Sequence, residues 1–275
     1  MEKRYNNMFK YLKNKKEAAL IPFITIGDPS IKTFFNIVDT LIYNGSDGLE
    51  LGIPFSDPLA DGPIIQKANK RALNLDINII KCFKLISIIR NKYPNIPIGI
   101  LIYVNIIYSY GIKKFYNQCY KSGIDSVLIV DVPIEEFIPF YKESIKNKIL
   151  PVLICPPNAS NFLLKKLSSF HCAYTYVLSR SGITGIDQII NNNFDISNLF
   201  SQLIKYNAAL PLQGFGIQTT KHIKNAIKNG AYGVILGSFI IKLIEDYQND
   251  SIILLKKLKN MIIKFKSATI SVEKK

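Results

Sequence analysis

Eight short apolar runs recur along the chain, each rich in β-branched or other apolar residues and each followed by polar or glycine-containing sequence. The runs are continuous and do not alternate with polar residues, which is typical of parallel strands covered on both faces. They are ALIPFITI (19–26), GLELGI (48–53), PIGILIYV (97–104), DSVLIVD (125–131), LPVLICP (150–156), AYTYVLS (173–179), ALPLQGF (209–215) and GVILGS (233–238).

Helical patterns separate these runs, and several of them close on a glycine, as helices often do: Gly45, Gly123 and Gly230. Successive strand and helix units of this kind predict a closed (β/α)₈ TIM barrel with extra N- and C-terminal helices. A doubly wound open sheet is the alternative. That fold is expected to have a GxGxxG turn after its first strand, where this chain has GDPS.

A length of 275 residues suits one large barrel or two smaller domains. No linker interrupts the alternation, so residues 1–275 are expected to form a single domain. No apolar run reaches the roughly 18 residues that a membrane helix needs. The first residues have the spacing of an amphipathic helix and lack a signal-peptide core, and the four cysteines show no CxxC pairing. The expected location is the cytoplasm, with no membrane association.

The net charge of +15 raises nucleic acid as a partner. The lysines are scattered through the predicted helices and form no basic stripe, which argues against nucleic-acid binding.

Glu50 stands in the middle of an apolar strand, between Leu49 and Leu51. Because side chains alternate along a strand, the two leucines face the helices and Glu50 faces the barrel interior. A carboxyl group in an apolar barrel has a raised pKa, which makes it a proton donor and acceptor near neutral pH.

Two further acids follow Glu50 in the loop FSDPLADGP. Asp61 precedes Pro63 at the expected start of a helix, where an aspartate either caps free amides or takes part in catalysis, and the pattern leaves both open. Asp57 with Pro58 is an ordinary turn pair by itself.

Glycines after the last two strands suggest a phosphate site. Gly214 and Gly216 follow the seventh run, and Gly237 with Ser238 follows the eighth and opens a helix. Exposed backbone amides and a helix N-terminus at this place form the usual phosphate cradle of a TIM barrel. The polar, glycine-containing segment SRSGITGIDQIINNN after the sixth run has the composition of a mobile lid, although an ordinary surface loop has it too.

Absences narrow the chemistry. No lysine lies in a predicted strand, which argues against a Schiff base, and His171 and His222 are badly placed for a metal site, so none is expected. Phe23, Tyr103 and Tyr176 are placed to line an aromatic pocket or simply to fill the barrel core.

These motifs together resemble the tryptophan synthase alpha subunit family. The resemblance rests on LELGIPFSDPLADGP with Gln66 and Ala68, and on PFITIGDP, ICPPNA, YTYVLSRSGITG and LQGFGI in the same order and spacing, and it covers essentially the whole chain. It implies a lyase that cleaves indole-3-glycerol phosphate to indole and glyceraldehyde 3-phosphate, without a cofactor of its own. It also implies a beta-subunit partner in an assembly of two alpha and two beta subunits, with pyridoxal phosphate only in the beta subunit.

The resemblance also assigns roles to residues. Glu50 would protonate the indole ring and later accept a proton, and Asp61 would accept a hydrogen bond from the indole N–H. The indole pocket would consist of Phe23, Leu101, Tyr103, Leu128, Tyr176 and Phe215, and the phosphate would bind Gly185, Gly214, Gly216, Gly237 and Ser238. Thr184 would contact Asp61 from the lid, and Asp57 and Pro58 would meet the beta subunit.

Tyr232 and Phe239 depart from the family pattern around GVILGS, which leads to the expectation of an altered phosphate site. Two other functions remain open from the sequence: another phosphate-binding barrel enzyme, such as a sugar-phosphate isomerase, and a non-catalytic activator of the beta subunit.

Overall fold

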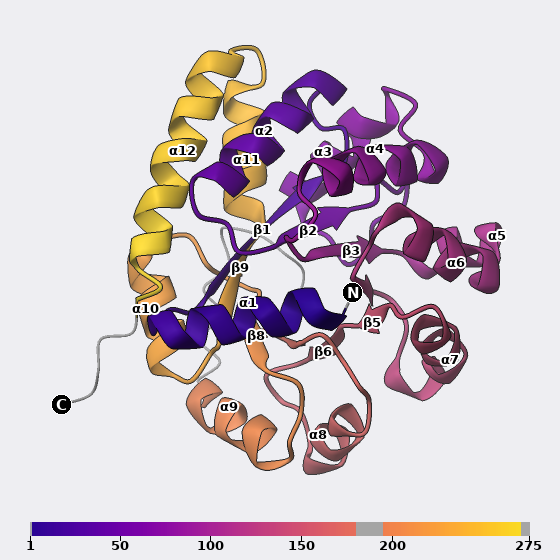
Figure 1. The fold of residues 1–275 in the computed structure, drawn as a ribbon, viewed down its shortest axis with the longest axis vertical. Helices are drawn as coiled ribbons and strands as arrows, with labels where there is room; N and C mark the ends of the chain where they lie inside the picture. Colours follow the sequence, from indigo (N-terminus) through magenta and orange to yellow (C-terminus); the bar gives the residue numbers. More distant parts are fainter. Residues whose placement is uncertain (1, 180–194, 271–275) are drawn as a thin grey trace.

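A parallel barrel surrounded by helices forms the body of the protein (Figure 1). The structure is a computed structural model, and it describes residues 2–179 and 195–270. The strands are β1 (Ala19–Thr25), β2 (Leu49–Gly52), β3 (Ile98–Ile102), β4 (Ser126–Ile129), β5 (Leu150–Pro151), β6 (Leu153–Cys155), β7 (Thr175–Val177), β8 (Pro211–Gln213) and β9 (Gly233–Leu236).

All strand pairs are parallel, and their order is β5-β4-β3-β2-β1-β9-β8-β7-β6. The two outermost strands of this order, β5 and β6, are consecutive in the chain and are separated only by Val152. The segment therefore pairs with β4 through its first half and with β7 through its second, which closes the sheet into a barrel. The predicted TIM barrel is confirmed, and each of the eight runs supplies a strand, the fifth of them in two pieces.

The helices alternate with the strands and cover the outside of the barrel (Figure 1). They are α1 (Glu2–Lys15), α2 (Ile31–Tyr43), α3 (Pro63–Leu73), α4 (Ile79–Lys92), α5 (Val104–Tyr110), α6 (Ile112–Ser122), the 3₁₀ turn η1 (Ile134–Glu136), α7 (Ile138–Lys146), α8 (Asn161–Ser168), α9 (Ile196–Lys205), α10 (Thr220–Lys228), α11 (Ser238–Tyr247) and α12 (Ser251–Ser267). Among the helices in the described ranges, none combines the length and the hydropathy needed to span a bilayer.

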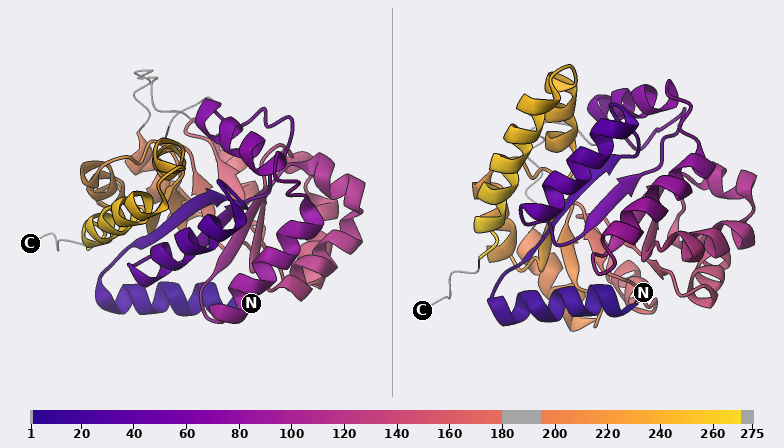
Figure 2. Two further views of the ribbon diagram at one scale, coloured as in Figure 1. Left: turned by 90° about the horizontal axis from the view of Figure 1, so that it is seen from above. Right: turned by 45° about the horizontal axis from the view of Figure 1, so that its top comes forward.

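The two terminal helices were predicted as additions to the barrel, and the structure places both. α12 packs beside α2 and α11 on the outside. α1 instead lies across the end of the barrel where the strands begin, as the view from above in Figure 2 shows. Tyr5, Met8 and Leu12 of α1 are buried at helical spacing, which is why this short polar helix holds to the body.

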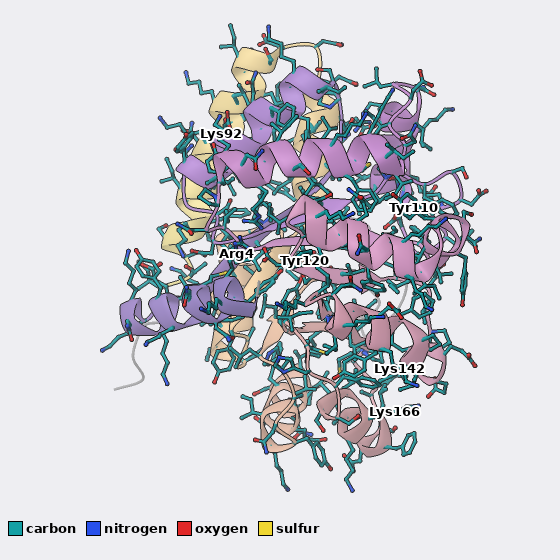
Figure 3. The ribbon with its side chains drawn as sticks, turned by 45° about the vertical axis from the view of Figure 1, so that its right-hand side comes forward. Arg4, Lys92, Tyr110, Tyr120, Lys142 and Lys166 are labelled. Carbon is teal, nitrogen blue, oxygen red and sulfur yellow. The ribbon has the colours of Figure 1, made fainter. Side chains whose placement is uncertain are left out.

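Positive charge is dispersed over the outer helices. Figure 3 shows Lys92, Lys142 and Lys166 on α4, α7 and α8, well separated on one side of the molecule. Two of them are paired, Lys92 with Asp39 at 2.6 Å and Lys166 with Glu135 at 3.3 Å.

Candidate active site

Glu50 lies inside the barrel, as strand alternation predicted. Its side chain is fully buried, and its register partners are Phe23 on β1 and Gly99 on β3. The Tyr174 hydroxyl donates a hydrogen bond to Oε1, while Oε2 has no hydrogen-bond partner among the described residues. Burial raises the pKa of Glu50 to about 7, and the Tyr174 hydrogen bond opposes this rise only in part.

Asp61 lies in the loop between β2 and α3, and it does not cap the helix. The N-cap of α3 is Gly62, with Pro63 in the first turn and no side-chain capping bond. The Asp61 carboxylate instead accepts a 3.4 Å hydrogen bond from Asn69 Nδ2 and one from the Tyr103 hydroxyl. Burial raises its pKa to about 6, and these two donors limit the rise.

The two carboxyl groups therefore differ in protonation at neutral pH. Asp61 is partly exposed and has two donors, so most of it is ionised at pH 7. Glu50 is fully buried with one donor, so about half of it keeps its proton at that pH. An acid and a carboxylate in unequal surroundings are the arrangement that acid–base catalysis uses.

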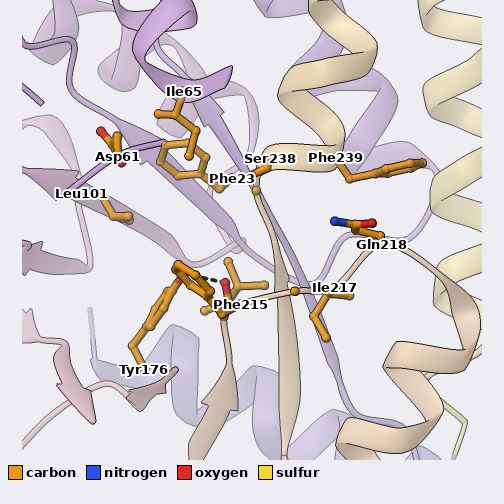
Figure 4. Close-up of a pocket in the computed structure, with 14 residues that line it drawn as sticks. Phe23, Asp61, Ile65, Leu101, Tyr176, Phe215, Ile217, Gln218, Ser238 and Phe239 are labelled. Atoms are coloured by element: carbon orange, nitrogen blue, oxygen red, sulfur yellow. Dashed lines mark hydrogen bonds between the residues drawn. The ribbon is translucent and has the colours of Figure 1, made fainter. Parts of the chain in front are cut away.

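A pocket opens at the C-terminal ends of the strands (Figure 4). The space between its lining residues, with the open solvent at its mouth included, is about 550 Å³. Nine of the predicted site residues line it: Phe23, Asp61, Leu101, Tyr176, Gly214, Phe215, Gly216, Gly237 and Ser238. The chain thus brings together residues that belong to, or follow, six strands far apart in sequence: β1, β2, β3, β7, β8 and β9.

Three predicted residues lie beside this lining and not in it. Glu50 is next to the lining, because its register partner on β1, Phe23, is a lining residue. Tyr103 is buried, stacks on Phe55 with ring centroids 5.0 Å apart, and accepts a hydrogen bond from the Ala60 amide at 3.1 Å. Leu128 is buried in the interior of the barrel at β4.

The glycines of the predicted phosphate site have a steric role as well. A Cβ at Gly214 would overlap the Tyr176 ring, whose hydroxyl donates to the Gly214 carbonyl oxygen at 2.8 Å (Figure 4). Gly216 has a φ of +73°, which disfavours other residues. Gly237 is the N-cap of α11, so the first amides of that helix, including that of Ser238, lack intrahelical partners and point toward the pocket end.

The two residues that depart from the family pattern around GVILGS, Tyr232 and Phe239, lie in different parts of the structure. Phe239 lines the pocket and stacks on Phe265 of α12 at 5.8 Å, so it belongs to the site. The expectation for Tyr232 was wrong, because Tyr232 precedes β9 and lines a groove with α1 residues at the opposite end of the barrel.

Asp57 and Pro58 lie in the loop after β2, where Asp57 is exposed and Pro58 partly exposed. The adjacent Leu59 is 85% exposed. Thr184 and Gly185 lie outside the described residues, as does most of the segment predicted to be a lid.

Sequence reasoning missed Tyr174 and Asn69, the partners of the two acids, and the lining residues Ile65, Ile217, Gln218 and Ile235. Tyr174 precedes Tyr176 by two positions, so strand alternation would have placed both inside the barrel. Asn69 follows Ile65 by four positions, so it shares the inner face of α3. Within 2–179 and 195–270, no three His, Cys, Asp or Glu side chains gather as a metal site.

The fold and these residues define the class of protein: a TIM-barrel enzyme with two carboxyl groups at the catalytic end of its barrel. Comparison with known proteins refines this. The family model described as tryptophan synthase alpha chain matches residues 9–270. The tryptophan synthase alpha chains of Citrobacter koseri and of an Escherichia coli O17:K52:H18 strain are each 48% identical over 266 residues, covering 97% of this chain and 98% of theirs.

Solved structures agree. Tryptophan synthase subunit alpha from Legionella pneumophila superposes with a TM-score of 0.86 at 26% identity, covering 98% of this chain and 99% of that one. A chain of the tryptophan synthase complex from Pyrococcus furiosus does so with a TM-score of 0.80 at 28% identity, covering 91% and 98%. The chain belongs to the tryptophan synthase alpha chain family, lyases that cleave a carbon–carbon bond of indole-3-glycerol phosphate in tryptophan biosynthesis.

Proposed function

We propose that Glu50 and Asp61 carry this cleavage, with Glu50 as the acid and base and Asp61 as the carboxylate that stabilises the ring. The observation that supports this most is the contrast between the two groups: a fully buried carboxyl with a pKa of about 7 beside a pocket that a partly exposed carboxylate lines. The proton transfers by Glu50 and the charge stabilisation by Asp61 require no cofactor.

Glu50 supplies the proton that makes indole a leaving group. Its protonated carboxyl donates to the ring carbon that bears the glycerol chain, because neutral indole leaves far more readily than an indolyl carbanion. The carboxylate then takes the proton of the side-chain hydroxyl as the carbon–carbon bond breaks, which forms the aldehyde and restores the acid. Because Glu50 is bonded to Tyr174 and lies below the pocket lining, its side chain rotates away from Tyr174 to reach the ring.

Asp61 accepts the hydrogen bond of the indole N–H. Protonation of the ring carbon places positive charge on the indole, and an ionised carboxylate at the nitrogen stabilises that charge. The donors Asn69 and Tyr103 favour the ionised form of Asp61 and fix its orientation.

The remaining lining holds the two ends of the substrate. The indole ring would contact Phe23, Leu101, Tyr103, Leu128, Tyr176 and Phe215, and the phosphate would bind the amides of Gly185, Gly214, Gly216, Gly237 and the hydroxyl of Ser238. Thr184 would contact Asp61 when substrate is bound. The stacked position of Phe239 supports a phosphate end that is partly walled by an aromatic ring.

The partner in this proposal is the tryptophan synthase beta subunit, in an assembly of two alpha and two beta subunits. One related structure is described as the a2b2 complex of a hyperthermophile, Pyrococcus furiosus. The exposed loop at Asp57, Pro58 and Leu59 would meet the beta subunit, which would hold the pyridoxal phosphate. The protein would act as a single domain, residues 1–275, in the cytoplasm.

The test is indole release from indole-3-glycerol phosphate by Glu50→Gln and Asp61→Asn, each measured alone and with the beta subunit. We expect each variant to lose activity by a factor of about 10² to 10⁴, the usual contribution of a positioned acid or base. Asp76→Asn is the matched control, because Asp76 is an exposed acid with a φ of +55° that asparagine also tolerates. Full activity of Glu50→Gln would refute the role of Glu50. Absence of turnover by the wild type in both states, with the beta subunit still activated, would instead support the non-catalytic alternative.

A further inference from the structure

The N-terminal helix α1 is docked on the barrel end by two consecutive residues that meet two consecutive residues of the β4 segment. Arg4 Nη1 donates to Asp125 Oδ1 at 2.8 Å, and the Tyr5 hydroxyl lies 2.8 Å from Ser126 Oγ. Asp125 is fully buried and also accepts from Arg90 Nη2 at 2.6 Å. These contacts fix both the position and the direction of α1.

Tyr5 reaches the barrel interior, and only 2% of it is exposed. Its ring packs against the Tyr174 ring with centroids 5.7 Å apart, and Tyr174 donates a hydrogen bond to Glu50 Oε1. A chain of contacts therefore leads from α1, on the outside, to the acid proposed for catalysis.

Gly99 on β3 makes room for this arrangement. A Cβ at Gly99 would lie 2.7 Å from Ser126 Oγ, 3.2 Å from the Tyr5 hydroxyl and 3.8 Å from Glu50 Cγ. The three groups thus converge on the space that the missing side chain leaves, beside Glu50, the register partner of Gly99.

We propose that Tyr5 is a positioning residue for Glu50. Its ring closes the barrel interior at the end where the strands begin, which we call the floor. In this position the ring supports Tyr174 and keeps water away from the Glu50 carboxyl. The inference rests on the proposed role of Glu50 for its effect on the rate. α1 is then a part of the active site, although it lies at the end of the barrel where the strands begin (Figure 2) and the pocket is lined by residues at the other end.

The surroundings of Glu50 agree with a floor that acts by excluding water. The titratable groups that face it are the phenols of Tyr174 and Tyr176 from the β7 segment and Tyr5 from α1. Burial raises the pKa of each phenol, so all three are neutral in the working range. The charges of Asp125, Arg4 and Arg90 lie beyond Tyr5, and Asp61 lies toward the pocket mouth. Burial, and not a neighbouring charge, is the main cause of the raised pKa of Glu50.

The test compares Tyr5→Ala, which opens the floor, with Tyr5→Phe, which keeps the ring and removes only the bond to Ser126. Leu12→Ala is the matched control, since it truncates another buried residue of α1 that lines the outer groove and not the barrel interior. Two quantities are measured on the full chain: the alkaline midpoint of indole formation, and the midpoint of the Glu50 carboxyl by ¹³C NMR, with the signal assigned by its loss in Glu50→Gln.

For Tyr5→Ala we expect both midpoints to fall by about one pH unit, because water that enters the floor solvates the carboxylate. The rate would fall about tenfold at pH 8 and little at pH 5.5. Tyr5→Phe and Leu12→Ala should keep the wild-type midpoints. If Tyr5→Ala does not fold, Tyr5→Leu serves instead, with a smaller shift in the same direction.

Unchanged midpoints in Tyr5→Ala, or in Tyr5→Leu where that variant replaces it, would overturn the inference and leave Tyr5 as ordinary packing. A midpoint that also shifts in Leu12→Ala would overturn it too, since loosening of α1 would then suffice. If the NMR midpoint shifts and the rate profile does not, the floor acts on Glu50 as inferred, and it is the assignment of Glu50 as the acid that fails.

Discussion

The ionisation of Glu50 should destabilise the fold, and Glu50→Gln should remove that effect. The carboxyl is fully buried, and in the described part of the chain Tyr174 alone donates to it, at Oε1, while Oε2 has no hydrogen-bond partner. Glutamine keeps the shape and can still accept from Tyr174, but it cannot ionise. Comparison of the two proteins across pH therefore isolates the free energy of placing this charge in the barrel.

The magnitude follows from the pKa. The pKa of Glu50 is raised from 4.5 to about 7, so the folded state binds a proton that the unfolded state has already lost over that interval. Stability then falls as pH rises, by about 1.4 kcal/mol per pH unit, and the full effect of about 3 kcal/mol is reached above pH 7. Below pH 4.5 both states are protonated and the effect vanishes. This is opposite in sign to the usual salt-bridged carboxylate, which stabilises at neutral pH.

The assay is urea unfolding of wild type and Glu50→Gln at pH 5 and pH 8, with free energies from linear extrapolation. The stability of the variant relative to wild type should increase by about 2.5 kcal/mol between these two pH values. Glu136→Gln, at an exposed site, controls for removal of a negative charge, and its curve should run parallel to wild type.

A constant difference between Glu50→Gln and wild type at both pH values would refute the reasoning. Glu50 would then ionise in the folded state as readily as in water. The same result would remove the physical basis for Glu50 as an acid at neutral pH, because the pKa that makes it a donor is the pKa that makes its ionisation unfavourable.

Two further predictions concern the pocket lining and a buried ion pair. Gly214→Ala should lower kcat/KM at least about tenfold with little change in unfolding free energy, because the added Cβ displaces the Tyr176 ring from the pocket; normal steady-state kinetics would contradict this. Arg71→Ala should destabilise the fold by about 3 kcal/mol in urea unfolding, because it leaves the buried Asp28 carboxylate without the bonds at 2.6 and 2.8 Å from Arg71. Asp28→Asn with Arg71→Ala should recover part of that loss, and equal stability of the single and double variants would be evidence against the explanation.

The barrel could be predicted from sequence because its strands are buried on both faces and read as uninterrupted apolar runs. The orientation of Glu50 followed from alternation alone. The division of the fifth apolar run into two strands could not be predicted, because it depends on how the sheet closes into a barrel. Leu150–Pro151 pairs with β4, Pro151 has no N–H to donate, and Leu153–Cys155 pairs with β7, a division that only the complete ring of strands imposes.

The sequence could predict site residues only where a residue's place along the chain determines its place in the barrel. Tyr232 and Phe239 flank the same run, yet they lie at opposite ends of a four-residue strand that is itself about 13 Å long at about 3.3 Å per residue, so only Phe239 reaches the pocket. The sequence left Asp61 open between a helix cap and a catalytic group, and the position of Gly62 as the N-cap of α3 excludes the first of these. For Tyr5 the sequence predicted only a place on the apolar face of an N-terminal helix, since its contact with Tyr174 depends on where α1 meets the barrel.

The position of Tyr5 links stability to catalysis through one ionisation. If the floor holds the pKa of Glu50 high, then opening it has two opposite effects: lost packing around Tyr174 destabilises the fold at every pH, while easier ionisation of Glu50 relieves the destabilisation that wild type has above pH 7. Tyr5→Ala should therefore be less stable than wild type by more at pH 5 than at pH 8. A packing defect alone gives the same loss of unfolding free energy at both pH values. A loss that differs between pH 5 and pH 8 would therefore show that Tyr5 affects the pKa of Glu50, and an equal loss would show that Tyr5 contributes packing only.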